Sequence, residues 1–112
     1  METKKKILFI DDDKDFGLLL SRLLADKPFD LLFAYTLSEG MTKLETEQPE
    51  HIFLDNNLPD GLGWEKADFI LSHYPKAHLN LLSALGVPKT SASTFRILEK
   101  PISLDELLAC LN

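Results

Sequence analysis

Short runs of consecutive apolar residues alternate along this chain with longer segments in which apolar positions recur every three or four residues. The apolar runs lie at residues 7–10, 31–34, 52–54, 79–82 and 97–98. Continuous apolar runs of this length are typical of strands that are buried on both faces of a parallel sheet. The alternation therefore predicts five parallel strands connected by helices.

Four segments have the apolar spacing of amphipathic helices. Their apolar positions are Phe16, Leu19, Leu20, Leu23 and Leu24 in the first, Leu37, Met41 and Leu44 in the second, Ala67, Ile70 and Leu71 in the third, and Leu104, Leu107, Leu108 and Leu111 in the last. We expect the third helix to run from about Trp64 to Ser72. Capping-box sequences at Thr36 and Ser103 predict where the second and last helices begin.

Two stretches do not follow this alternation. Pro59, Gly61 and Gly63 lie in residues 56–63, and we expect no regular structure there. Residues 84–95 have little apolar periodicity, which predicts a truncated or irregular fourth helix. Right-handed crossovers would place the helices on both faces of the sheet. The expected fold is therefore α/β, a doubly wound five-stranded parallel sheet.

Size and charge narrow the functional class. The 112 residues fit one domain, residues 1–112, and the formal net charge is −6. An acidic surface repels phosphate backbones and anionic lipid, so we expect no direct binding to nucleic acid or membrane. The single cysteine, Cys110, has no cationic sequence neighbour and is expected to pack rather than react. A lone thiol is compatible with the reducing cytoplasm.

Polar residues follow four of the five predicted strands. In a doubly wound sheet, functional groups gather outside the carboxyl ends of the strands. The groups delivered there are Asp11, Asp12 and Asp13 after the first strand, Asp55 after the third, Ser83 after the fourth and Lys100 after the fifth. Clustered carboxylates repel one another unless a cation joins them, and oxygen ligands with room for water suit Mg²⁺.

This set of groups predicts a reaction. A carboxylate beside bound Mg²⁺ can attack phosphorus and form an acyl phosphate. Lys100 would neutralise charge on the transferring group, and the Ser83 hydroxyl would donate a hydrogen bond to one of its oxygens. The residues thus indicate Mg²⁺-assisted phosphoryl transfer to an aspartate.

Four motifs together resemble a known family. ILFIDDD, FLDNNLPDGLG, LLSA and LEKP, in this order and at the ends of strands one, three, four and five, resemble the receiver domain of two-component response regulators. The resemblance covers essentially the whole chain and implies the flavodoxin-like, CheY-like fold. It also implies a cytoplasmic domain that accepts a phosphoryl group from a histidine kinase or phosphotransfer protein and catalyses only its own phosphorylation and dephosphorylation. A downstream protein, an effector domain or a second copy of the domain would be further partners.

The resemblance also assigns roles to single residues. Asp55 would be the phosphoacceptor, and Ser83 and Lys100 would bind the phosphoryl oxygens. A cis bond before Pro101 would aim the lysine. The implied Mg²⁺ ligands are Asp12 directly, Asp11 through water or as a residue that orients the metal's shell, Asp55, and the backbone carbonyl of Asn57.

The chain departs from the family on the output side. The stretch between Ser83 and Lys100 is short, and Ile97 occupies the position of the family's aromatic switch residue. Phe95 is nearby, but at a spacing that points it to the other face of a strand. We therefore expect an atypical output face.

Several residues have simpler interpretations. Asp13 and Asp15 are expected to cap the first helix and to favour its dipole rather than bind metal. The three histidines, His51, His73 and His78, lack metal-ligand spacing and are expected at the surface or at strand edges.

Three rival functions agree less well with the sequence. A pseudo-receiver would keep the fold as a phosphorylation-independent interaction module. A haloacid-dehalogenase-like phosphatase would need a second aspartate two residues after Asp55, where Asn57 stands. A flavodoxin-like electron carrier would need a phosphate-binding loop after the first strand, where the aspartates would repel a flavin phosphate.

Overall fold

The structure is a computed structural model that describes residues 4–84 and 96–111. Five parallel strands form one sheet with the order β2-β1-β3-β6-β7. These strands are β1 (Lys5–Ile10), β2 (Phe29–Ala34), β3 (His51–Asp55), β6 (His78–Ser83) and β7 (Arg96–Glu99). The prediction of a five-stranded parallel sheet is confirmed.

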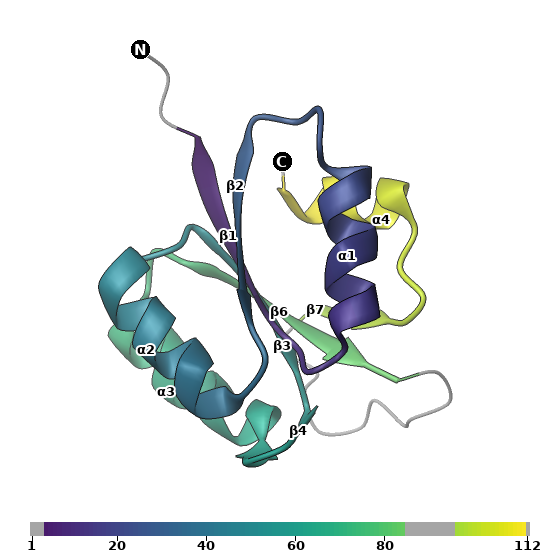
Figure 1. The fold of residues 1–112 in the computed structure, drawn as a ribbon. Coiled ribbons are helices and arrows are strands. Elements are labelled where there is room, and N and C mark those ends of the chain that lie inside the picture. The colour runs from purple at the N-terminus through teal and green to yellow at the C-terminus, as the bar shows by residue number, and fades with distance from the viewer. Residues whose placement is uncertain (1–3, 85–95, 112) are drawn as a thin grey trace.

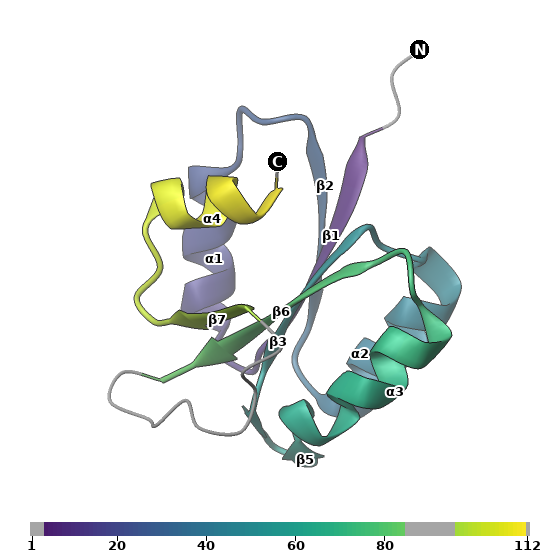
Figure 2. The same ribbon diagram turned by 180° about the vertical axis from the view of Figure 1, so that it is seen from behind.

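Helices cover both faces of this sheet. The α-helices of the described residues are α1 (Lys14–Leu23), α2 (Leu37–Glu47), α3 (Ala67–His73) and α4 (Leu104–Leu111). Figure 1 shows α2 and α3 together on one side of the sheet, and Figure 2, from behind, shows α1 and α4 together on the other. The doubly wound arrangement is therefore also confirmed.

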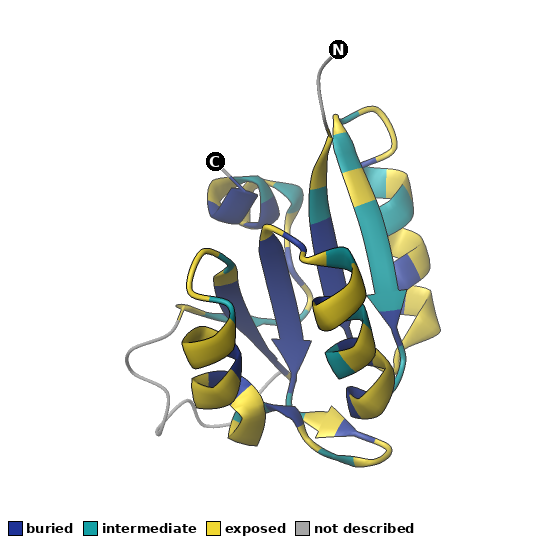
Figure 3. Ribbon diagram, turned by 90° about the vertical axis from the view of Figure 1, so that its left-hand side faces the viewer, coloured by how far each residue is buried: buried dark blue, intermediate teal, exposed yellow. Residues whose placement is uncertain are grey.

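Alternation along the strands divides the core in two. Successive side chains of a strand point to opposite faces. In β1, Leu8 and Ile10 belong to the core beneath α2 and α3, whereas Ile7 and Phe9 belong to the core beneath α1 and α4. Figure 3 shows the central strands buried and the outer sides of the helices exposed. No described helix is long and apolar enough to cross a membrane.

Side-chain caps begin the helices near the expected residues. Asp13 Oδ1 accepts hydrogen bonds from the backbone N–H groups of Asp15 (3.0 Å) and Phe16 (3.2 Å), so Asp13 is the N-cap of α1 as predicted. Thr36 Oγ1 accepts a bond from the N–H of Glu39 (3.0 Å), although the Glu39 carboxylate reaches the N–H of Tyr35 rather than that of Thr36. The capping box that begins α4 is formed in both directions.

The expectation for residues 56–63 is wrong. Two-residue strands, β4 (Asn57–Leu58) and β5 (Gly61–Leu62), pair there as a small antiparallel hairpin. Gly61 has φ +154°, a conformation that lacks a steric penalty only for glycine, and it permits the tight turn. The next helix begins as a 3₁₀ turn over Gly63–Lys66 and continues as an α-helix over Ala67–His73. The expected helix from about Trp64 to Ser72 is therefore confirmed to within one residue at each end, although its first turn is 3₁₀.

Some expected burial patterns need correction. Leu19 and Leu71 were expected on the buried faces of their helices, but they are exposed, because the sheet covers a narrower stripe of each helix. His51 is expected at the surface or at a strand edge, but it is buried, because β3 lies between β1 and β6 and the His51 ring stacks on His78 (centroids 5.1 Å apart). Cys110 is buried as predicted, but it has a cationic neighbour in space: Arg96 Nη1 lies 3.3 Å from its Sγ.

The expected irregular fourth helix falls on residues 85–95 and, like Phe95, lies outside the described residues. Ile97, at the position of the family's aromatic switch residue, is half-buried in β7 and packs against the core beneath α2 and α3.

Candidate functional site

Three carboxylates meet where β1 and β3 end. The two strands are parallel neighbours, and Ile10 pairs with Leu54 in their register. The next residues, Asp11 after β1 and Asp55 at the end of β3, therefore lie side by side. Together with Asp12 they offer ligand oxygens that lie within 4.8 Å of one another. The structure thus brings together the three predicted metal-ligating aspartates.

Backbone contacts hold the loop after β1. The N–H of Asp11 donates to the carbonyl of Ala34 (2.9 Å), which extends the pairing with β2 by one residue. Asp11 Oδ1 accepts a hydrogen bond from the N–H of Asp13 (3.0 Å). Asp11 is buried and Asp12 is exposed. One carboxylate of the pair therefore lies in the protein interior and the other faces solvent.

Another set of contacts holds the loop after β3. The N–H of Gly63 donates to the carbonyl of Asn56 (2.7 Å), and the N–H of Trp64 donates to Asn56 Oδ1 (3.1 Å). A Cβ atom added to Gly63 would lie 2.1 Å from the backbone oxygen of Asp55. Only glycine allows the two backbone segments to approach this closely. Gly63 is a site-supporting residue that the sequence motif contained but whose role the sequence analysis missed.

The electrostatics of the site favour the neutral form of Asp55. Burial raises the pKa of this carboxyl, the negative charge of Asp11 raises it further, and the Lys100 ammonium opposes both effects; the resulting pKa is about 6. A carboxylate whose pKa is raised in this way is stabilised by a proton or another cation beside it. The site is therefore built to accept further positive charge beside Asp55.

Lys100 supplies one positive charge to this cluster. Its Nζ forms an ion pair with Asp11 Oδ2 and lies 3.9 Å from Asp55 Oδ2. The N–H of Lys100 donates to the carbonyl of Ser83 (2.9 Å), which fixes the ends of β6 and β7 together. The Lys100–Pro101 peptide bond is cis, as the family resemblance implied.

Ser83 carries a buried hydroxyl that no described residue partners. The residue ends β6, only 2% of its surface is exposed, and its Oγ has no hydrogen-bond partner among the described residues. A buried hydroxyl without a partner is costly, so such a group indicates a ligand atom that completes it. An oxygen of a group attached to Asp55 would be such a partner, because Asp55 pairs with the residue before Ser83 in the sheet register.

The donor set fits a divalent cation. Clustered oxygen ligands, one of them exposed to water, match the preference of Mg²⁺ for a few carboxylates and several waters. Asn57, whose backbone carbonyl was assigned as a further ligand, lies two residues after Asp55 at the start of β4 and is exposed. The side chains present therefore agree with the predicted metal.

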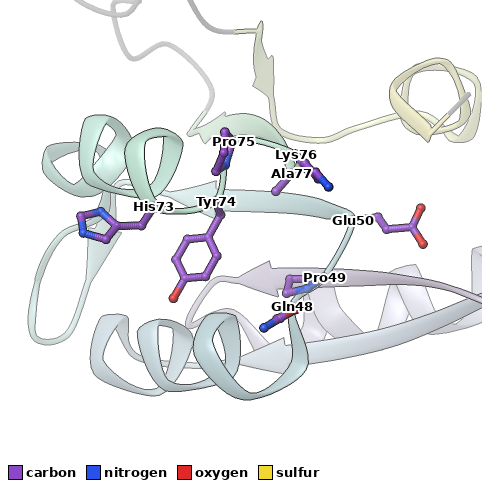
Figure 4. Close-up of a pocket in the computed structure, with 8 residues that line it drawn as sticks. All are labelled: Gln48, Pro49, Glu50, His73, Tyr74, Pro75, Lys76 and Ala77. Atoms are coloured by element: carbon purple, nitrogen blue, oxygen red, sulfur yellow. The ribbon is translucent and has the colours of Figure 1, made fainter.

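Two cavities lie at opposite ends of the sheet. One of about 520 Å³ lies at the carboxyl ends of the strands and is lined by residues that include Asp13, Phe16, Lys100 and Pro101. The other, of about 470 Å³, is lined by residues 48–50 and 73–77, where strands β3 and β6 begin (Figure 4). Only the first cavity contains a residue of the carboxylate and lysine cluster.

Sequence reasoning missed one further neighbour of the cluster. The ring centroid of Phe16, in the first turn of α1, lies 4.8 Å from Lys100 Nζ. The sequence analysis assigned Phe16 only to the core. The position of Phe16 in the sequence does not predict this contact, because Lys100 lies 84 positions later and the contact depends on the conformation of the lysine side chain.

Comparisons with known proteins agree with this geometry. The family model described as response regulator receiver domain matches residues 7–112. The "Acid tolerance regulatory protein ActR" of Rhizobium meliloti (strain 1021) is 29% identical over 96% of this chain and 58% of its own length. The chain thus spans little more than half the length of that relative.

Solved structures have the same fold. The signal receiver domain of an HD domain-containing protein from Pseudomonas fluorescens Pf-5 has a TM-score of 0.85 and 25% identity, over 96% of this chain and 91% of that one. A response regulator protein from Burkholderia pseudomallei has a TM-score of 0.84 and 23% identity, over 97% of this chain and 67% of that one. The chain has the flavodoxin-like, CheY-like fold, and it belongs to the response regulator receiver domain family.

Proposed function

We propose that this receiver domain accepts a phosphoryl group on Asp55 from a histidine kinase or phosphotransfer protein in a Mg²⁺-dependent reaction in the cytoplasm. The observation that carries the proposal is the surroundings of Asp55. Its carboxylate ends a central strand beside the carboxylate of Asp11 and the ammonium of Lys100. These are the groups that an incoming phosphoryl group requires.

The proposed step balances as a single displacement. A carboxylate oxygen of Asp55 forms a bond to phosphorus, and the bond from phosphorus to the donor histidine nitrogen breaks. The electron pair of that bond leaves with the nitrogen, which then takes a proton. Lys100 neutralises charge on the equatorial oxygens, and the Ser83 hydroxyl donates a hydrogen bond to one of them.

The metal would be held by Asp12 directly, by Asp11 through water or as a residue that orients the metal's shell, by Asp55 and by the backbone carbonyl of Asn57. Bound there, Mg²⁺ would offset the repulsion among the carboxylates and the negative charge of the transferring group. The structural relative from Burkholderia pseudomallei was crystallised with a phosphorylated aspartic acid and a calcium ion, which supports both parts of the proposal.

The domain would act only on itself, by catalysing its own phosphorylation and dephosphorylation. Its output would pass to a downstream protein, an effector domain or a second copy of the domain. We propose that this output is atypical, because Ile97 gives β7 no aromatic ring at the family's switch position. An aliphatic side chain packed in the core offers no ring that could turn with phosphorylation.

Intact mass tests the acceptor role. The chain is incubated with acetyl phosphate and Mg²⁺, beside Asp55→Asn and an EDTA control. We expect a gain of one phosphoryl group in the unaltered chain and none in Asp55→Asn or in EDTA. The matched control is Asp68→Asn, an exposed aspartate on α3, which should be phosphorylated like the unaltered chain.

The opposite result has a clear meaning. A gain that persists in Asp55→Asn would move the acceptor to another residue. No gain in the unaltered chain, together with no binding of Mg²⁺, would contradict the proposal and favour a phosphorylation-independent interaction module.

A further inference from the structure

The ring of Phe16 faces the lysine of the site. Its centroid lies 4.8 Å from Lys100 Nζ, and the residue is only 8% exposed. Phe16 and Lys100 both line the 520 Å³ cavity at the carboxyl ends of the strands. Nothing in the acceptor chemistry described above uses this ring, although the ring lies against one of its charged groups.

The loop after β1 fixes the position of this ring. Asp13 Oδ1 accepts a hydrogen bond from the N–H of Phe16, and Asp11 Oδ1 accepts one from the N–H of Asp13. The segment that presents the metal-ligating carboxylates therefore also presents the aromatic ring. Phe16 is also a buried member of the core beneath α1 and α4.

Lys100 needs a partner besides the carboxylates. Its flexible four-carbon stem loses rotamer entropy when the ammonium is held in one place. In the described structure the ammonium is paired with Asp11, which is also an expected ligand of the metal. When a divalent cation binds, the Asp11 carboxylate would interact with the cation as well as with the Lys100 ammonium. A contact that does not involve a carboxylate would keep the ammonium at the site.

The face of an aromatic ring is such a contact. It carries partial negative charge and attracts an ammonium, most strongly where water is excluded. We propose that Phe16 is a positioning residue that keeps the Lys100 ammonium beside Asp55 when a cation occupies the carboxylates. This inference rests on the proposed phosphoryl transfer to Asp55, and it predicts that the ring affects the reaction without affecting the affinity for the metal.

Three variants separate this role from packing. Phe16→Leu removes the ring and keeps most of the apolar volume, and Phe16→Tyr keeps the ring. Phe33→Leu is the matched control, because Phe33 packs against the same core and stacks on Phe9 with ring centroids 5.6 Å apart.

The contact itself is measured without metal or phosphodonor. Protons above a ring face shift upfield in NMR spectra, so the εCH₂ protons of Lys100 should resonate upfield in the unaltered chain and in Phe16→Tyr. They should move to the ordinary lysine position in Phe16→Leu and stay shifted in Phe33→Leu. Unshifted protons in the unaltered chain would overturn the proposal, and this measurement needs no variant to fold.

The role in the reaction is measured with two constants. At saturating Mg²⁺, the rate of phosphorylation by acetyl phosphate should fall about three- to tenfold in Phe16→Leu and recover in Phe16→Tyr. The dissociation constant for Mg²⁺, from calorimetry, should stay within about twofold, because the carboxylates are untouched. Equal losses of rate and affinity, or the same losses in Phe33→Leu, would show a packing role only and would overturn the proposal.

The failure of this inference differs from the failure of the proposed function. An unaltered chain that gains no phosphoryl group contradicts the acceptor role of Asp55. An unaltered chain that is phosphorylated at the same rate as Phe16→Leu contradicts only the positioning role of Phe16.

Discussion

Asp55 is held in a surrounding that suits a neutral or cation-bound carboxyl better than a free anion. Burial and the charge of Asp11 raise its pKa from 3.8 to about 6. A pKa that is higher in the folded chain than in the unfolded chain means that the ionised group lowers stability. That penalty is complete above about pH 6 and is relieved as the pH falls toward 4, because the folded chain takes up its proton first.

Replacing this carboxylate should therefore stabilise the metal-free protein. In EDTA at pH 7.5, we expect Asp55→Asn to raise the free energy of unfolding by about 1–2 kcal/mol, allowing for screening by solvent. The gain should vanish near pH 4. Urea unfolding at the two pH values measures it, with the exposed Asp68→Asn as control. A loss of stability in Asp55→Asn at pH 7.5 would contradict the pKa shift.

His51 should respond to acid in the opposite sense. Burial lowers its pKa below 6.5, and the neighbouring His78 and Lys5 lower it further. A histidine whose pKa is lower in the folded chain costs stability as the pH falls below 6.5, because the unfolded chain is protonated first. We expect His51→Phe, which keeps a flat ring against His78, to lose less stability between pH 7 and pH 5 than the unaltered chain. Urea unfolding at the two pH values measures this loss, and an equal loss of stability in the two proteins would refute the prediction.

At the scale of elements, glycines show which segments tolerate a side chain. A Cβ on Gly63 would meet the backbone oxygen of Asp55 at 2.1 Å, whereas a Cβ on Gly17 would meet ring carbons of Phe33, the nearest of them at 3.3 Å. We expect Gly63→Ala to lower the free energy of unfolding by about 2–4 kcal/mol, since backbone must move. Gly17→Ala, inside α1, should change it by less than about 1 kcal/mol. Thermal unfolding of both variants tests the contrast, and equal effects would contradict it.

The elements were predictable where one local rule decided them. Apolar runs predicted the strands, and Asp13 and Ser103 predicted where helices begin, because an apolar run and a helix cap are both local features of the sequence. The hairpin of β4 and β5 and the burial of His51 were not predictable in this way. The hairpin depends on a glycine at φ +154°, and the burial depends on which strand lies in the middle of the sheet.

The residues of the candidate site also divide into those that a simple rule predicted and those that only the three-dimensional structure shows. The meeting of Asp11, Asp12 and Asp55 was expected because strand ends of a parallel sheet share an edge. The contact of Phe16 with Lys100 and the approach of Gly63 to Asp55 required distances in space. Sequence order carries no information on either distance.

At the scale of the whole molecule, the carboxylate cluster should couple metal binding to folding. A cation that binds only the folded chain adds about 2.7 kcal/mol to the free energy of unfolding when its concentration is about 100 times its dissociation constant. We expect this increase with Mg²⁺ in the unaltered chain and a much smaller one in Asp12→Asn. Urea unfolding with Mg²⁺, and with NaCl at the same ionic strength, measures it. An equal increase with NaCl would point to charge screening of the acidic chain instead.

Trp64 gives the loop after β3 an optical property. Its indole Nε1–H donates to the carbonyl of Leu54 (3.3 Å), the residue before Asp55, and it is the only tryptophan of the chain. Excitation near the red edge of indole absorption therefore reports on one position in the chain, next to the residue that precedes Asp55. The wavelength and lifetime of Trp64 emission would therefore report changes in the loop after β3 in stopped-flow experiments, without an added fluorescent label.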